Sequence, residues 1–325
     1  MKKLVISSLT SGGIIVNYNC SSACRHCLYA CSPTREKSYM SQETAALICS
    51  YLKKFNCSSV HIGGGEPLLN LHLLCEVVDV LTKNNIFIEY VETNCSWATT
   101  DKKTTETIEQ LLYHGIQCLL ISVDPFHNEF IPFEKVQRTI SSCKKSGMRT
   151  LIWQAEFESD ILRFDAKTTH KPAEYISHYG FSYFADVCTR YGIVFGGRAA
   201  DIFRKYSEKY PIGTILKNSS PCQRLANTSH FHIDLYKKYI PTLCTGFSVP
   251  IEEIDCIPHK YPLLNGLYAE GISFLYNLAT MQYNYCPRGE GYVNNCDLCL
   301  DIRKHLFNLS ALYLELSPSG FYKAL

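Results

Sequence analysis

Residues 16–27 read Val-Asn-Tyr-Asn-Cys-Ser-Ser-Ala-Cys-Arg-His-Cys and place three cysteines, Cys20, Cys24 and Cys27, after an apolar run typical of a β-strand. The C-x3-C-x2-C spacing lets one short loop wrap around a single iron–sulfur cluster. Three thiolates on a four-iron cluster leave one iron without a protein ligand, where a substrate or cofactor can coordinate. The pattern therefore indicates chemistry more than electron storage. The same spacing also fits a zinc site with His26 or Cys31 as the fourth ligand.

A second motif, Gly-Gly-Gly-Glu-Pro at residues 63–67, ends the next strand-like run. Glycine lets a backbone approach a ligand closely, because no Cβ stands in the way. The Glu66 carboxylate can accept a hydrogen bond from an ammonium or a metal-bound amine. Alone, such a motif is more often a turn. Here it follows the three-cysteine loop (residues 20–27), and a strand-like run precedes each motif, which favours a cofactor site.

Together the two motifs resemble those of the radical S-adenosylmethionine (radical SAM) enzymes. In that family a strand, the three-cysteine loop and a strand ending in Gly-Gly-Glu-Pro open a partial α/β barrel. The resemblance implies that the three cysteines hold a 4Fe–4S cluster whose open iron chelates the methionyl amine and carboxylate of S-adenosylmethionine (SAM). The family often has an aromatic residue before the third cysteine; this chain has His26, whose ring can also pack over adenine. The resemblance further implies that three residues lie along the methionyl amino group: Gly64, Gly65 and Glu66.

The composition is that of an ordinary soluble globular protein, with 46% hydrophobic and 19% charged residues in a chain of 325. A net charge of +2 gives no basic field, so we expect no nucleic-acid partner. No apolar run approaches the roughly 20 residues that span a bilayer, and the first residues lack the apolar core of a signal peptide. We therefore expect a cytoplasmic protein without a membrane partner.

Seventeen cysteines are present, and their distribution does not predict a disulfide framework. The chain is long enough to bury a core without cross-links. Cys49, Cys75 and Cys143 fall in helix-like runs, where they behave as small buried apolar residues. The clustered cysteines are candidate metal ligands, and a reducing interior suits both groups.

Strand and helix signals alternate over residues 1–205, which predicts a parallel sheet with crossover helices. We expect strands at 14–17, 59–62, 86–91, 118–123, 150–154 and 192–195. Helices are expected between them at 41–55, 70–83, 104–113, 133–145 and 173–191, and a further one at 261–281. Six βα units match the partial barrel of the radical SAM family. The predicted fold is therefore α/β, with a partial (β/α)6 TIM-like barrel over residues 1–205 and an irregular cysteine-rich domain over residues 206–325.

Polar residues follow the later predicted strands, where functional groups gather in parallel barrels. His127 is expected to reach the substrate or shuttle a proton, which makes it the candidate catalytic residue. Similar positions in the radical SAM family contact the carboxylate and ribose of SAM. The resemblance thus implies four further cofactor contacts, although each side chain could instead cap a helix or hold a loop: Asn94, Ser122, Asp124 and Arg198.

A second cysteine pattern marks the last third of the chain, where the alternation stops. Cys296 and Cys299, at C-x2-C spacing, can place two thiolates on one metal, and distant cysteines can complete the set. The preferred set adds Cys222 and Cys244, with Cys286 as a reserve or extra ligand. Many radical SAM enzymes carry a C-terminal extension that holds a second iron–sulfur cluster. This tail resembles such an extension in outline, but its spacing departs from the best-known seven-cysteine pattern. Zinc and an empty set of buried thiols are the alternatives.

Two histidines, His230 and His232, alternate on a strand-like run before Cys244 and so point to the same face. The spacing is consistent with metal ligands or with bases that face a substrate. A satisfied pair on a half-buried strand is the commoner arrangement.

The resemblance also implies an activity. A low-potential donor such as ferredoxin or flavodoxin would supply an electron, SAM would be cleaved reductively, and the 5′-deoxyadenosyl radical would abstract hydrogen from a substrate. A peptide or protein side chain is the expected substrate class, and a small metabolite is the alternative. A non-catalytic iron–sulfur or zinc protein for electron transfer or assembly would explain the cysteines, but it would not need the glycine motif.

Overall fold

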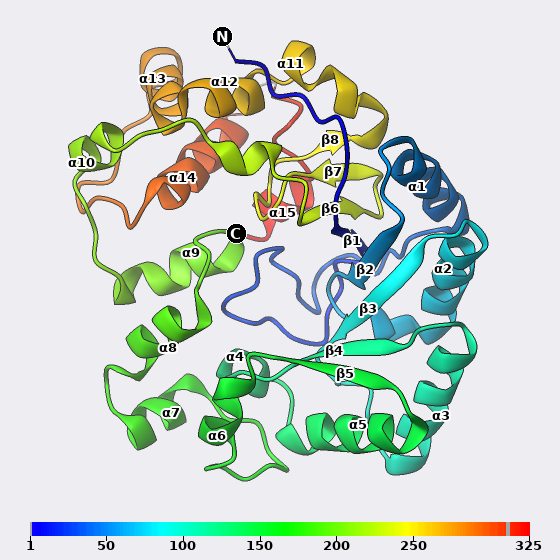
Figure 1. Cartoon of the computed structure of the whole chain (residues 1–325). Coiled ribbons are helices and arrows are strands. Elements are labelled where there is room, and N and C mark those ends of the chain that lie inside the picture. Colours follow the sequence, from blue (N-terminus) through cyan, green and yellow to red (C-terminus); the bar gives the residue numbers. More distant parts are fainter. Residues whose placement is uncertain (1, 310–312) are drawn as a thin grey trace.

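Six parallel strands form the body of one open sheet in the computed structural model, which describes residues 2–309 and 313–325 (Figure 1). The order across the sheet is β5-β4-β3-β2-β1-β6, and antiparallel β7 and β8 extend it beyond β6. This arrangement confirms the predicted α/β fold with a partial barrel. The strands are β1 (Gly12–Ile15), β2 (Ser59–Gly63), β3 (Phe87–Thr93), β4 (Cys118–Ser122), β5 (Arg149–Trp153), β6 (Phe231–Asp234), β7 (Lys238–Ile240) and β8 (Val249–Pro250).

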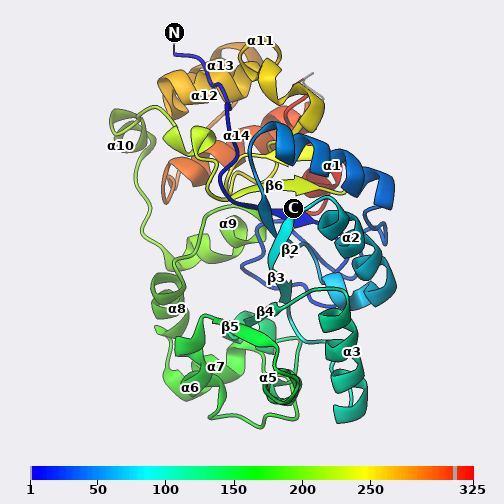
Figure 2. The same cartoon turned by 45° about the vertical axis from the view of Figure 1, so that its right-hand side comes forward.

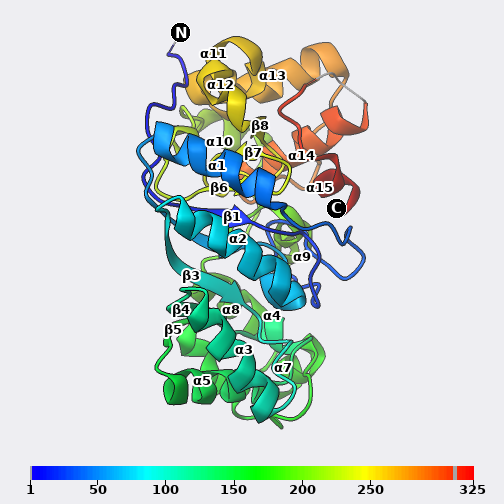
Figure 3. The same ribbon diagram turned by 90° about the vertical axis from the view of Figure 1, so that its right-hand side faces the viewer.

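The helices that connect the first five strands cover the outer side of the sheet, as Figure 3 shows. α1 (Gln42–Lys54) and α2 (Leu71–Lys83) begin where the sequence predicts, because the side chains of Ser41 and Asn70 each accept a hydrogen bond from a backbone N–H in the first turn. The apolar faces of these helices pack on the sheet and bury residues such as Val78. The remaining helices of this part are η1 (Pro67–Asn70), α3 (Asp101–Tyr113), α4 (Pro125–Asn128) and α5 (Phe133–Ser146).

The predicted strand at residues 192–195 is wrong, because the sixth parallel strand is β6. Gly192, in the left-handed region at φ 68°, ends the preceding helix, and Gly197 turns the chain again at φ 53°. The apolar run between these two glycines is therefore a short connection. The predicted helix at 173–191 is also two helices, since Gly180 interrupts it at φ 96°.

A helical insertion fills the space between β5 and β6 (Figure 2). Its apolar side chains, among them Tyr175, Phe184 and Phe203, form a second core together with Phe126 of α4 and Cys24. The insertion therefore packs against the three-cysteine loop at Cys24. Its elements are η2 (Ala155–Phe157), α6 (Glu158–Ile161), α7 (Pro172–Tyr179), α8 (Tyr183–Tyr191), α9 (Gly197–Phe203), η3 (Arg204–Tyr206) and α10 (Ile212–Lys217).

The C-terminal third packs helices against the β6–β8 end of the sheet, at the top of Figure 1. The predicted helix at 261–281 breaks at Gly271, whose φ is 77° and whose Cβ, if present, would lie 2.1 Å from the Ser220 carbonyl oxygen. β6 comes from the predicted second domain yet joins the barrel sheet, and the boundary at residue 205 stays a prediction. The elements are η4 (Gln223–Ala226), η5 (Ile251–Cys256), α11 (Ile257–Lys260), α12 (Pro262–Glu270), α13 (Ile272–Tyr283), α14 (Asn295–Asn308) and α15 (Ser319–Lys323).

Within residues 2–309 and 313–325, every helix is too short or too polar to cross a membrane.

Candidate iron–sulfur and SAM site

The three-cysteine loop follows β1 and lies at the carboxyl ends of the parallel strands. Cys20 and Cys24 are buried, and Cys27 is partly buried. A single zinc ion holds its thiolate sulfurs about 3.8 Å apart, from a Zn–S distance of about 2.3 Å and tetrahedral geometry. In the described part of the chain, no three cysteine sulfurs lie within 4.8 Å of one another. The three sulfurs are therefore not gathered as one zinc ion would hold them, an arrangement that a larger cluster can use.

Polar groups point at the sulfurs of this loop. The backbone N–H of Ser22 donates to Cys20 Sγ at 3.4 Å, and the Asn94 side-chain amide donates to the same sulfur at 3.5 Å. Burial raises the pKa of the Cys20 thiol, whereas the hydrogen bond from the Cys31 thiol lowers the pKa of Cys27 to about 6. Donors of this kind stabilise thiolate ligands and tune the metal they hold. These features fit a 4Fe–4S cluster on the three cysteines.

The glycines of the second motif pack against the start of the three-cysteine loop. A Cβ on Gly64 would lie 2.5 Å from the Asn17 carbonyl oxygen, and one on Gly65 would lie 2.0 Å from the Asn19 carbonyl oxygen. The Gly65 N–H donates to the Asn17 carbonyl at 3.0 Å. Glycine is therefore required here because the chain itself fills the space, a reason that the sequence alone does not reveal. The contact of Gly64 and Gly65 with the methionyl group stays a prediction.

Glu66 is fully buried and ties the end of β2 to the end of β3. Its carboxylate accepts hydrogen bonds from the Thr93 hydroxyl at 3.0 Å, the Asn94 N–H at 2.7 Å and the Leu68 N–H at 3.1 Å. Burial raises the pKa of Glu66 to about 7, against the lowering effect of these donors. Both carboxylate oxygens thus have partners within the chain, which leaves the backbone of Gly64–Glu66 as the simpler surface for the predicted methionyl contact.

Asp124 and His127 form a buried pair after β4. The Asp124 carboxylate caps α4 through the Phe126 and His127 N–H groups and accepts from His127 Nδ1 at 2.7 Å. Burial opposes ionisation of Asp124, but the charges of His127 and His26 hold its pKa at about 2. Burial also opposes the charge of His127, yet Asp124 and the Cys24 thiol raise the pKa of His127 above its ordinary value. His127 therefore contacts Cys24, a predicted cluster ligand. In this position it can hold a proton or place a positive charge beside the cluster.

Arg198, at the start of α9, holds the three-cysteine loop from the other side. Its Nε donates to the Cys24 carbonyl at 3.0 Å, its Nη2 donates to the Cys31 carbonyl at 2.6 Å, and its backbone N–H donates to the Cys27 carbonyl at 3.1 Å. This is a positioning role, and the predicted contact with SAM is not part of it. Gly197 allows the close approach, since a Cβ there would lie 2.2 Å from the Leu28 carbonyl oxygen.

Two other predicted positions lie at the same rim. His26 packs against Phe126 and Tyr191, each with ring centroids 4.9 Å away, and burial lowers the pKa of His26 to about 4. The Nδ1 atom of His26 is buried without a hydrogen-bond partner among the described groups. Ser122 ends β4, half-buried, opposite Trp153 on β5. The predicted roles of both residues stay predictions.

The structure brings together four of the five C-terminal cysteines that the sequence analysis selected as ligands. Burial and the neighbouring thiols of Cys222 and Cys296 raise the pKa of Cys244, and burial raises the pKa of Cys299 to about 11 with a further contribution from Cys296. Cys286 is exposed, and it is not among the groups that shift the pKa values of Cys222, Cys244 and Cys299. The preferred set thus forms one group, and Cys286 lies apart from it.

A buried arginine on α14 accompanies this second group. Arg303 is 5% exposed, and its guanidinium neighbours Cys244 and Cys299. Its Nη1 donates to the Thr245 carbonyl at 2.8 Å, whereas its Nε has no partner among the described groups. A buried cation with a free donor beside two of these thiols fits an anionic cluster that accepts the remaining hydrogen bond.

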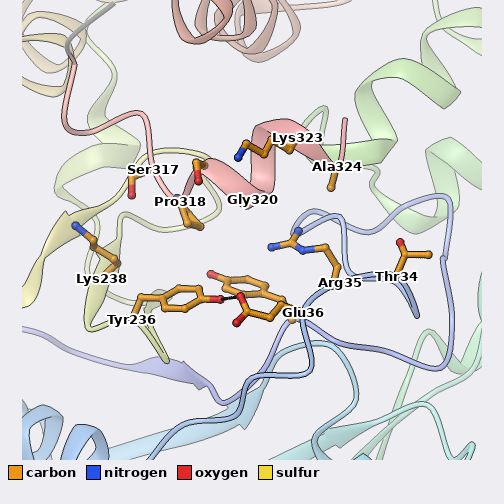
Figure 4. Close-up of a pocket in the computed structure, with 12 residues that line it drawn as sticks. Thr34, Arg35, Glu36, Tyr236, Lys238, Ser317, Pro318, Gly320, Lys323 and Ala324 are labelled. Atoms are coloured by element: carbon orange, nitrogen blue, oxygen red, sulfur yellow. Dashed lines mark hydrogen bonds between the residues drawn. The ribbon is translucent and has the colours of Figure 1, made fainter. Parts of the chain in front are cut away.

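A pocket of about 680 Å³ opens between residues 34–36, which follow the three-cysteine loop, the β6–β7 turn and the C-terminal helix (Figure 4). Its lining includes three cations, Arg35, Lys238 and Lys323, and one carboxylate, Glu36, which accepts a hydrogen bond from the Tyr236 hydroxyl at 3.3 Å. The balance of charge suits the pocket to a small anion.

Comparison with known proteins agrees with this site. Residues 14–154 match the family model described as the radical SAM superfamily. The matched segment contains the second half of β1, the strands β2 to β5, the three-cysteine loop and the glycine motif. Residues 14–154 therefore form a radical SAM domain, which supports an enzyme whose reaction the match does not specify. A search among curated proteins found no match.

Several solved structures are similar to the chain. Native anSMEcpe with bound AdoMet shares 14% identity over 92% of this chain and 97% of that chain, with a TM-score of 0.47. SuiB of Streptococcus suis bound to the precursor peptide SuiA shares 12% over 90% and 76%, with a TM-score of 0.42. BtrN in complex with AdoMet and 2-DOIA shares 14% over 78% and 82%, with a TM-score of 0.39.

Proposed function

We propose that this radical SAM enzyme binds SAM at a 4Fe–4S cluster held by Cys20, Cys24 and Cys27. When bound and reduced, the cluster would supply the electron that cleaves the sulfonium, which yields methionine and the 5′-deoxyadenosyl radical that takes a hydrogen atom from a substrate. One observation carries the proposal: the three thiols, two buried and one partly buried, stand at the same rim as the glycine motif, joined to it through Asn94 and Glu66.

The residues around the loop have separable tasks in this proposal. Gly65 and Arg198 hold the loop in place, and Glu66 fixes the end of β3 beside it. His127, charged through Asp124, stands next to the Cys24 thiol, where it can stabilise a thiolate or hold a proton. Asn94 donates to Cys20 and keeps the rim polar. The predicted SAM contacts of Gly64, Ser122 and the other rim residues belong to the same proposal.

The test uses the full chain, purified and reconstituted without oxygen, reduced and given SAM. We expect 5′-deoxyadenosine by chromatography from the wild type and none from Cys24→Ala. Cys256→Ala is the matched control, because Cys256 is half-buried and belongs to neither cysteine group. A Cys24→Ala protein that still forms 5′-deoxyadenosine would refute the ligand assignment.

We also propose that Cys222, Cys244, Cys296 and Cys299 hold a second iron–sulfur cluster. Two observations support this assignment. Neighbouring thiols of the set raise the pKa values of Cys244 and Cys299, and the Arg303 guanidinium lies beside these two thiols.

Iron content tests this second site. Two 4Fe–4S clusters give about eight irons per chain, and Cys296→Ala with Cys299→Ala should lower this to about four. Cys286→Ala should leave iron unchanged, since Cys286 is exposed and apart from the others. Unchanged iron in the double variant, or zinc in place of the lost iron, would remove the second cluster.

For the substrate, we infer a peptide or protein side chain, with a small metabolite as the alternative. The inference rests on the resemblance of the C-terminal segment to cluster-bearing extensions of peptide-modifying radical SAM enzymes. The electron donor would be a low-potential protein such as ferredoxin or flavodoxin, in the cytoplasm. Incubation of the reduced enzyme with a synthetic precursor peptide and SAM, followed by mass spectrometry of the peptide, tests this class.

A further inference from the structure

Three histidines meet on either side of β1, one on β2 and two at the start of β6. His61 lies on β2 and His232 on β6, and both pair in register with Gly13 of β1, which runs between them. Gly13 has no side chain, and a Cβ there would lie 2.2 Å from His61 Nε2 and 2.8 Å from His232 Cδ2. The two imidazoles therefore meet across Gly13. His230, one residue before β6, brings a third ring to the same place.

We propose that His61, His230 and His232 form a mononuclear site for a divalent transition metal such as zinc. One ring nitrogen from each histidine lies within 4.8 Å of the others, and the Nε2 atoms of His61 and His232 are 3.2 Å apart. Tetrahedral zinc with Zn–N bonds of about 2.0–2.1 Å holds its nitrogen ligands about 3.3 Å apart. The spacing of this pair is therefore that of two imidazoles on one ion.

A hydrogen bond between the rings of His61 and His232, without a metal, explains less of the arrangement of the three histidines. One Nε2–H donating to the other Nε2 would account for the pair, but it gives no reason for His230 to converge on the same point. His232 is 5% exposed, and its Nδ1 has no well-formed hydrogen bond, with the Thr242 backbone as its neighbour. A metal at Nε2 would hold this ring from the side that faces His61 and His230.

Three protein ligands leave a fourth position on a tetrahedral ion. Glu92 on β3 is nearest, with its carboxylate oxygen 3.8 Å from His61 Nε2 and its side chain 40% exposed. Glu92 or a water molecule would complete the site. The ion would then link β2 to β6 across β1, the place where a strand from the C-terminal third joins the barrel. Imidazole and carboxylate ligands suit zinc and similar divalent ions.

The experiment uses the full chain with its iron–sulfur clusters reconstituted, given zinc and then freed of unbound metal. We expect about one zinc per chain, bound in addition to the iron. His230→Gln should weaken zinc binding by more than about tenfold, the lower end of what even an outer-shell partner contributes, with iron per chain unchanged. His72→Gln, on the exposed face of α2, is the control and should bind as the wild type does.

The visible spectrum of the protein with Co(II) in this site identifies the kind of ligand that holds the metal. Co(II) in place of zinc should show the visible d–d bands of a tetrahedral site, without the thiolate charge-transfer band that cysteine ligands give. His61→Gln should abolish these bands. If that variant does not fold, the half-buried His230 supplies the test by itself. No retained zinc in the wild type, equal zinc in His230→Gln, or a thiolate band would each overturn the proposal. None of these outcomes depends on SAM cleavage, so the proposed function stands or falls separately.

Discussion

Gly65→Ala should displace the three-cysteine loop, because the new Cβ would lie 2.0 Å from the Asn19 carbonyl oxygen and 2.5 Å from the Asn19 carbonyl carbon. Ordinary contact begins at 3.4 Å, so the two backbones must separate by about 1.4 Å along that line, the difference between 3.4 and 2.0 Å. The neighbouring atoms are backbone and cannot rotate away. The shift would also stretch the Gly65 N–H to Asn17 and Glu66 N–H to Asn19 hydrogen bonds, now 3.0 and 3.1 Å.

The expected cost has two parts. Overpacking of this kind destabilises a fold by about 1–3 kcal/mol. A displacement of about 1 Å near reacting groups lowers a rate on the order of a hundredfold. We therefore expect 5′-deoxyadenosine formation to fall about a hundredfold, with iron lost from the first site and not from the second.

The assay is 5′-deoxyadenosine formed per minute, together with iron per chain, for the reconstituted variant. Gly213→Ala is the matched control: Gly213 lies in α10, its Cβ would meet nothing within 4 Å, and its φ is negative. That variant should cleave SAM as the wild type does. A Gly65→Ala protein with wild-type iron and rate would refute the claim that close packing of the two motifs positions the cluster.

Two further predictions concern charge at the two sites. Asp124→Asn should lower the free energy of unfolding by about 2 kcal/mol at pH 7, from a pKa of about 2 against the ordinary 3.8. Because this pKa is depressed, the stabilisation is present above pH 3.8 and is lost as the pH falls through about 2, so denaturant unfolding at decreasing pH should show the two proteins converge; a constant difference would contradict it. Arg303→Met should lower iron toward about four per chain by removing the cation beside Cys244 and Cys299, whereas Arg303→Lys should retain more iron. Iron at about eight in Arg303→Met would show that the cluster does not need this charge.

Local signals explain most of what the sequence predicted about the fold. Ser41 and Asn70 start helices because each side chain caps the N–H groups directly after it, and Gly147 ends a helix at φ 76°. The five first strands alternate with these helices and were placed within a few residues. In contrast, β6 pairs with β1 across more than two hundred residues of chain, and the run that forms it is four residues long. No local pattern distinguishes it from the apolar run at 192–195, so the sixth strand was misplaced.

Some residues of the candidate site are likewise predicted by local spacing, whereas others depend on partners far along the chain. The cysteines were found by spacing, because one short loop must supply all three thiols. The roles of Glu66 and Arg198 depend on partners far along the chain: β3 for the first, and carbonyls of the three-cysteine loop for the second. His61 was missed as a neighbour of His232 because only the parallel pairing of β2, β1 and β6 brings the two together.

The two cysteine groups are physically connected through a short segment that contains α9 and η3. At its start, Arg198 holds carbonyls of the three-cysteine loop. At its end, Arg204 donates to the fully buried Asp297 at 2.6 Å, on α14 between Cys296 and Cys299. Breaking a buried ion pair costs about 3–5 kcal/mol, so this link is rigid compared with a surface contact. A rigid segment of about two turns that contacts both cysteine groups fixes the distance and orientation between them. Electron transfer between two clusters, or a substrate bound between them, would require such a fixed arrangement.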